Sequence, residues 1–145
     1  MPDNSVMDLA RKSWTVNTPP QKKYLSRIIT YNLSRRLNKK LFEVVFEGYI
    51  DLYNPASEQP DVVIYSLSEM LTPAIAIELC SPEELFETRT MAKHLVEQYP
   101  IREFFVYEYT NRQWFRISKE SELQISFSDI LLADLKDSPY PLSSL

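Results

Sequence analysis

Glycine, histidine and cysteine are nearly absent from the sequence, which has one residue of each among 145. The single glycine, Gly48, excludes the glycine-rich phosphate loops of nucleotide-binding enzymes. The single cysteine, Cys80, cannot form a disulfide within the chain, so a reducing, cytoplasmic location is expected. His94 and Cys80 together supply too few ligands for a structural zinc site.

Long apolar runs are also absent. No stretch approaches the roughly 18 apolar residues of a membrane-spanning helix, and residues 1–16 hold no apolar signal-peptide core. We therefore expect no membrane partner. A length of 145 residues is typical of one domain that can bury a single core.

Charge is distributed unevenly, although the net charge is only −4. Residues 21–42 contain seven basic residues and no acid, whereas residues 43–89 contain ten acids and one base. The seven are Lys22, Lys23, Arg27, Arg35, Arg36, Lys39 and Lys40. A basic stripe beside an acidic region suits a protein that holds a phosphate backbone next to metal-binding carboxylates. A solvated helix face is the alternative explanation of the stripe.

Hydrophobic periodicity predicts an α/β fold (α+β, mixed sheet) with the element order α-β-β-β-α-β-β-α. Apolar residues recur at helical spacing from Tyr24 to Leu37 and predict a first helix of about five turns. Strands are predicted at Leu41–Leu52, Asp61–Leu67, Ala74–Cys80, Glu103–Tyr109 and Gln113–Ile117, and a short last helix at Ser128–Leu135. The domain then covers residues 21–135, between an N-terminal arm (1–20) and a C-terminal tail (136–145).

The second helix has two possible starts. Ser81-Pro82-Glu83-Glu84 has the composition of a helix N-terminus, with serine as the cap and proline at the first position. Alternatively this segment is a loop, and the helix begins near Glu87 or Thr88.

Two acidic residues, Asp61 and Glu78, lie in short apolar β-type runs where a charge is costly. Asp61 opens the second predicted strand, and Glu78 lies within the third. If these strands pair, a hard cation such as Mg²⁺ can be held between the two carboxylates. In the alternative interpretation Asp61 caps its strand and Glu78 forms a salt bridge with Arg89 or Arg27.

These segments resemble the PD-(D/E)XK nuclease superfamily, and in particular a widespread bacterial family of restriction-endonuclease-like proteins with a relocated lysine. The matching motifs are Pro60-Asp61-Val62-Val63, Ile77-Glu78 with Ser81-Pro82, Lys93 and Glu103-Phe104-Phe105-Val106, in this order between about Pro19 and Lys119. The resemblance implies a restriction-endonuclease-like core, a Mg²⁺ or Mn²⁺ ion bound by Asp61 and Glu78, and DNA as the substrate.

The chain departs from the superfamily pattern at the lysine. That pattern has a lysine two residues after the glutamate, where this sequence has Cys80, and a neutral thiol cannot replace an ammonium group. In the relocated-lysine family the cation comes from the following helix, which here indicates Lys93. If the helix starts at Pro82, Lys93 lies about 16 Å along it and passes the position of Glu78. If the helix starts near Glu87, this distance falls to about 9 Å and Lys93 can reach the site. In the alternative interpretation, Lys93 is a solvated lysine on the helix surface.

A second departure concerns the first helix, where many members of the superfamily have an acid. Residues 21–42 contain none, and either Glu43 or Glu47 could substitute.

The sequence thus predicts a metal-dependent DNA endonuclease that hydrolyses phosphodiester bonds. Its predicted catalytic residues are Asp61, Glu78 and Lys93, and its predicted DNA-backbone contacts are Lys22, Lys23, Arg27, Arg35 and Arg36. The alternative is a catalytically inactive nuclease-like fold that serves as a nucleic-acid-binding or assembly module, which Cys80 and the acid-free first helix favour. The aromatic pair of strands from Glu103 to Ile117 is expected to pack in the core and to offer a homodimer face.

Overall fold

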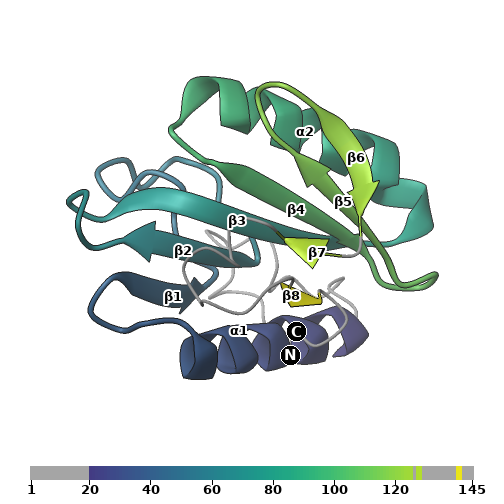
Figure 1. Cartoon of the computed structure of the whole chain (residues 1–145). Coiled ribbons are helices and arrows are strands. Elements are labelled where there is room, and N and C mark those ends of the chain that lie inside the picture. Colours follow the sequence, from purple (N-terminus) through teal and green to yellow (C-terminus); the bar gives the residue numbers. More distant parts are fainter. Residues whose placement is uncertain (1–19, 126, 129–139, 142–145) are drawn as a thin grey trace, which may run out of the picture.

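The computed structural model describes residues 20–125, 127–128 and 140–141. These form three layers, with a six-stranded sheet between two helices (Figure 1). Helix α1 (Pro20–Arg36) lies on one face of the sheet and helix α2 (Leu85–Gln98) on the other. The strands are β1 (Phe42–Phe46), β2 (Val62–Ser66), β3 (Thr72–Cys80), β4 (Glu103–Glu108), β5 (Gln113–Ile117) and β6 (Glu122–Ile125). Two short strands, β7 (Phe127–Ser128) and β8 (Tyr140–Pro141), pair separately.

The six strands lie in sequence order, β1-β2-β3-β4-β5-β6. All neighbours are antiparallel except β3 and β4, which are parallel. A parallel pair needs a crossover connection, and α2 provides it. The fold class predicted from the sequence, a mixed sheet flanked by helices, is therefore confirmed.

Strand β3 occupies the interior of the sheet because its side chains are apolar on both faces. Ile75, Ile77 and Leu79 pack toward α1, against Ile29 and Leu33. Ala76 and Cys80 pack toward α2, in a second core with Ala92, Leu95 and Val96. A strand buried on both faces reads as a continuous apolar run, which makes the glutamate within it conspicuous.

Several boundaries differ from those predicted. β1 ends at Phe46, because Glu47 adopts a positive φ of 57° that breaks the strand and begins a loop. A 3₁₀ turn at Pro82–Glu84 precedes α2, so the helical segment follows the earlier of the two predicted starts. The Glu84 carboxylate accepts hydrogen bonds from the Ser81 amide (3.1 Å) and hydroxyl (3.2 Å), as the local capping pattern indicated.

At the C-terminal side, β6 was not predicted. Of the predicted last helix, Ser128 lies in β7 and the rest falls outside the described residues, as do most of the predicted arm and tail. Within the described part of the chain, no helix is long and apolar enough to cross a membrane.

Candidate active site

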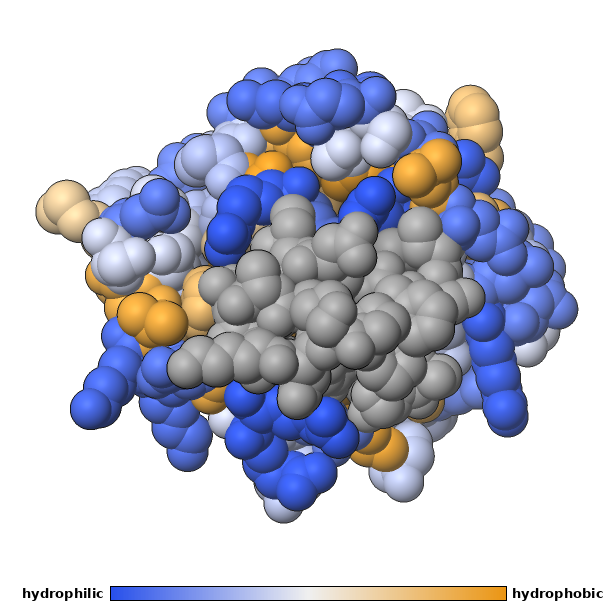
Figure 2. Space-filling model, in the orientation of Figure 1, coloured by the Kyte–Doolittle hydropathy of each residue, from blue (hydrophilic) through white to orange (hydrophobic). Residues whose placement is uncertain are grey.

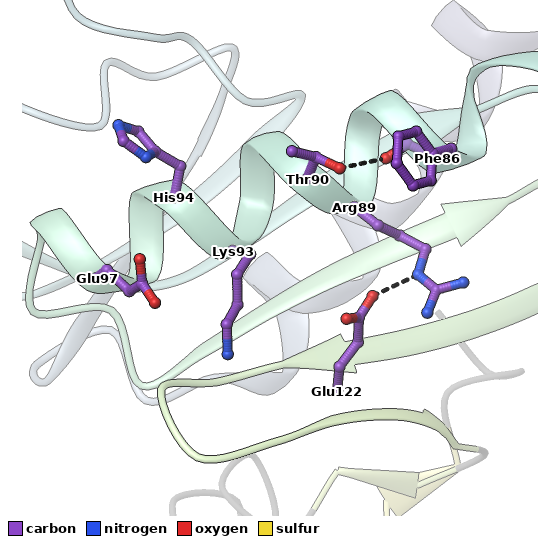
Figure 3. A pocket seen from close by; sticks show the side chains of 7 residues that line it. All are labelled: Phe86, Arg89, Thr90, Lys93, His94, Glu97 and Glu122. Carbon is purple, nitrogen blue, oxygen red and sulfur yellow. Dashed lines mark hydrogen bonds and ion pairs between the residues drawn. The ribbon is translucent and has the colours of Figure 1, made fainter.

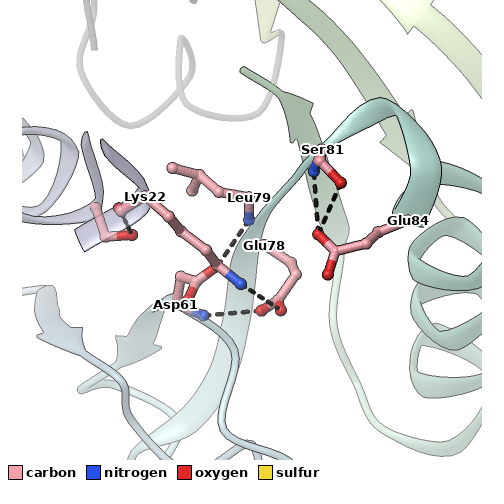
Figure 4. Close-up of polar contacts among 7 residues, drawn as sticks. Lys22, Asp61, Glu78, Leu79, Ser81 and Glu84 are labelled. Carbon is pink, nitrogen blue, oxygen red and sulfur yellow. Dashed lines mark hydrogen bonds and ion pairs between the residues drawn. The ribbon is translucent and has the colours of Figure 1, made fainter. Parts of the chain in front are cut away.

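The two predicted metal ligands lie side by side at one end of the β2–β3 pair (Figure 4). The register places Val62 opposite Ile77, so Asp61 and Glu78 are neighbours across the antiparallel ladder. The Asp61 amide donates to Glu78 Oε1 (3.0 Å), and the Leu79 amide donates to Asp61 Oδ2 (2.7 Å). Each carboxylate is therefore held in place by a backbone amide of the neighbouring strand or its extension.

Both acids are deeply buried, with 1% of Asp61 and 6% of Glu78 exposed. Two adjacent buried carboxylates repel each other and need a cation. Lys22 supplies a positive charge, because its Nζ lies 3.7 Å from Asp61 Oδ2 and 3.7 Å from Glu78 Oε2. Figure 4 shows its side chain extending from the start of α1 to the two carboxylates.

Lys22 reaches the site because it continues the buried face of α1. It precedes the buried residues Ser26, Ile29 and Leu33 by four, seven and eleven positions, a spacing that keeps all four on one side of a helix. The Ser26 hydroxyl also donates to the Lys22 carbonyl (2.9 Å). Ser26 is the first buried residue of α1, and Lys22 lies one turn before it. The Lys22 side chain therefore extends past the core to the end of the sheet, where the two carboxylates lie.

Cys80 does not supply a charge to this site. The thiol is 1% exposed and packs in the core on the α2 side. Burial, assisted by the carboxylates of Glu84, Glu78 and Glu108 and opposed by a hydrogen bond with Thr88, raises its pKa from 9.0 to about 11. Cys80 is therefore a protonated core residue at neutral pH.

Lys93 lies elsewhere, in a pocket of about 420 Å³ lined by α2 and by Glu122 of β6 (Figure 3). The pocket is lined by Phe86, Arg89, Thr90, Lys93, His94, Glu97 and Glu122. Its far wall is β6, which is three strands from β3 and thus about 14 Å away across the sheet. The structure does not bring Lys93 to Asp61 and Glu78, in agreement with the early start of the helical segment.

Arg89, one of the two residues considered as a partner of Glu78, is engaged in the same pocket. Its Nε donates to the Glu122 carboxylate, and its guanidinium lies over the Phe115 ring, 4.7 Å from the centroid. The guanidinium of Arg27, the other residue considered, lies over the Phe46 ring, 5.9 Å from the centroid.

Of the two glutamates considered as a third acid, Glu47 is adjacent to the site and Glu43 is not. The Glu47 amide donates to the Asp61 carbonyl (2.9 Å), and the side chain is 7% exposed. Glu43 is exposed on β1, opposite Tyr65. A non-glycine residue with positive φ stores backbone strain, and such strain concentrates at functional sites. Even so, no three His, Cys, Asp or Glu residues in the described ranges form a group that could hold a metal.

The predicted DNA-backbone contacts divide between two places. Lys22 points to the carboxylates, whereas Arg27, Arg35 and Arg36 are exposed on α1 and Lys23 is half-buried there. Sequence reasoning assigned Lys22 to the nucleic acid and missed its position in the site. The signal that could have found it is a lysine in register with the apolar face of an amphipathic helix.

Comparison with known proteins supports the fold. No protein-family model and no curated protein matches the chain. Among solved structures, one described as a "putative nuclease belonging to DUF820" from Anabaena variabilis superposes with a TM-score of 0.67. The superposition covers 86% of this chain and 79% of the other, at 9% sequence identity. At this identity the likeness shows that the two chains share a fold, which is the mixed α+β fold of a nuclease-like protein.

Proposed function

We propose that the chain is a metal-dependent endonuclease that hydrolyses phosphodiester bonds in DNA, with a PD-(D/E)XK type of site. The observation that carries the proposal is the cluster in which Lys22 Nζ lies 3.7 Å from a carboxylate oxygen of both Asp61 and Glu78. Two acids and one ammonium group at a strand end are the residue types that this chemistry needs. The described likeness to a nuclease fold and the basic first helix support the same assignment.

The donor set fits Mg²⁺ or Mn²⁺. Mg²⁺ prefers oxygen ligands and is commonly bound by one or two carboxylates, with waters completing its coordination. Asp61 and Glu78 would hold the ion, and Lys22 on its flexible stem would give way to it. When bound, the ion would polarise the scissile phosphate and lower the pKa of an attacking water.

Lys22 takes the role that superfamily members give to the lysine of the strand. Its ammonium group stabilises the negative charge that develops on the phosphate and orients the water, whereas the Cys80 thiol is neutral and Lys93 lies in another pocket. Lys23 and Arg36 would bind the phosphate backbone of the substrate along α1.

The test is cleavage of supercoiled plasmid DNA with Mg²⁺ or Mn²⁺, with EDTA as the metal-free control. We expect the Asp61→Asn, Glu78→Gln and Lys22→Met variants each to lose about 100-fold or more in rate, a loss typical when one charged catalytic group is removed. Lys93→Met is the matched lysine control and should cleave as the unaltered protein does. Equal rates for all five proteins would refute the assigned roles, and a loss confined to Lys93→Met would return the cation role to Lys93.

A second candidate function is a catalytically inactive, nuclease-like module that binds nucleic acid or assembles with a second copy. The same ion cluster favours it, because the Lys22 ammonium group already offsets part of the negative charge of the two acids without a metal. Calorimetric titration with Mn²⁺ separates the two candidates. The endonuclease takes up Mn²⁺ stoichiometrically and loses this uptake in Asp61→Asn, whereas the inactive module takes up none. Size-exclusion chromatography with light scattering tests the proposed homodimer.

A further inference from the structure

The outward side of α1 has a regular chemical pattern. Tyr24, Arg27, Tyr31 and Arg35 follow each other at intervals of three, four and four residues, which places them in one row along a helix. All four are exposed, and they lie opposite the buried residues of the helix. We call these four residues the Tyr/Arg row.

The two tyrosines of the row present large aromatic rings to solvent. Tyr24 is 65% exposed and Tyr31 is 62% exposed. Scattered apolar residues on a surface are ordinary, but two rings in register with two guanidinium groups form a continuous aromatic and cationic surface.

The charge of α1 favours a polyanion as the occupant of this surface. Residues 21–42 contain seven basic residues and no acid, in a chain whose net charge is −4. The helix therefore contains no acid of its own to offset the arginines, and Lys23 and Arg27 repel each other because like charges four residues apart cost helix stability. Figure 2 shows mostly hydrophilic residues along the side of the molecule where Figure 1 shows α1.

The guanidinium groups of the row already lie over aromatic rings. Arg35 lies over Tyr31, 5.0 Å from the ring centroid, and Arg27 lies over Phe46, 5.9 Å from the centroid. Such layers of ring and guanidinium provide faces on which bases stack. Tyr24 and Tyr31 are seven residues apart, about 10.5 Å along the helix axis, so the two rings can meet different bases of one strand.

We propose that the Tyr/Arg row is a binding surface for single-stranded nucleic acid, on which Tyr24 and Tyr31 stack bases and Arg27 and Arg35 contact phosphates. Unpaired bases are required because only they expose a face to the tyrosine rings. The surface lies on the side of α1 opposite Lys22, so it needs neither the metal nor the carboxylates. It goes beyond the proposed function and stands without it.

The test is fluorescence anisotropy of a labelled oligothymidine of about 12 nucleotides, with a duplex of equal length as comparison. EDTA is present so that cleavage plays no part. We expect the full chain to bind the single strand more tightly than the duplex. Loss of one stacking tyrosine weakens such binding by about tenfold, so Tyr24→Ala/Tyr31→Ala should weaken it about 100-fold.

Three further variants separate the contributions. Tyr24→Phe/Tyr31→Phe keeps both rings and should bind as the unaltered protein does. Tyr53→Ala removes a still more accessible tyrosine (83% exposed) in the β1–β2 loop and should also bind unchanged. Arg27→Gln/Arg35→Gln should lower the slope of log affinity against log salt by about 1.4, since each phosphate contact on a single strand contributes about 0.7.

Failure of this inference is distinguishable from failure of the proposed function. Asp61→Asn, which removes the proposed metal ligand, should bind the single strand with unchanged affinity. If the double tyrosine-to-alanine variant binds as tightly as the unaltered protein, or if single strand and duplex bind equally, the row is not a stacking surface. Absence of any binding, or self-association that depends on the two tyrosines, would also overturn the proposal.

Discussion

Replacing Lys22 by methionine tests whether its ammonium group holds the two buried acids together. At 3.7 Å and an effective dielectric constant of about 20, each contact is worth about 4.5 kcal/mol before desolvation is subtracted. The substitution removes the ammonium group that lies between Asp61 and Glu78, and breaking a buried ion pair costs about 3–5 kcal/mol. We expect the lower value, about 3 kcal/mol, because the 13% exposure of the Lys22 side chain gives water some access.

Urea denaturation at pH 8 measures this loss. With a slope of about 2 kcal/mol per molar urea, a loss of about 3 kcal/mol lowers the midpoint by about 1.5 M. Lys40→Met is the matched control, because Lys40 is exposed after the end of α1, and it should change the free energy of unfolding by no more than about 0.5 kcal/mol. Equal urea midpoints for Lys22→Met, Lys40→Met and the unaltered protein would refute the reasoning.

Two further predictions follow from buried groups. With its pKa raised from 9.0 to about 11, the Cys80 thiol at pH 8 is about 0.1% ionised instead of about 9%, so iodoacetamide should alkylate it at least 100-fold more slowly in the folded protein than in urea. A comparable rate in both would contradict the burial of the thiol. Gly48→Ala places a Cβ 2.5 Å from the Tyr65 hydroxyl, which donates to the Tyr49 carbonyl, and should destabilise the fold by about 1–3 kcal/mol. Combining it with Tyr65→Phe, which removes that hydroxyl, should cost less than the sum of the two single changes in urea denaturation.

The acids could be predicted from the sequence because local patterns determine their positions. Strand alternation and a short connection place Asp61 and Glu78 on neighbouring strands, and the register then brings them together. Lys22 belongs to a helix, and its distance from the acids depends on how that helix packs on the sheet. The alternation of side chains along the strands does not determine this packing, so it could not predict the position of Lys22.

The positions of Lys93 and β6 show two other limits of the sequence. Whether Lys93 can reach the two acids depends on where the second helical segment begins. The capping residues Ser81 and Glu84 indicated the early start, which the structure has, whereas the resemblance favoured the later one. β6 is a four-residue edge strand in which Leu123 is exposed, so its hydrophobic pattern is too short to recognise.

The segment between β1 and Asp61 has a consequence for how the protein can diversify. Its base is fixed by hydrogen bonds from the Glu47 amide to the Asp61 carbonyl and from the Ile50 amide to the Glu58 carbonyl, whereas Tyr53 at its tip is exposed. Doubling the length of such a loop costs only about 0.6 kcal/mol in closure entropy. Insertions at the tip can therefore reshape the rim of the site while the aspartate stays in place, which makes this loop a natural position for evolution or engineering to vary.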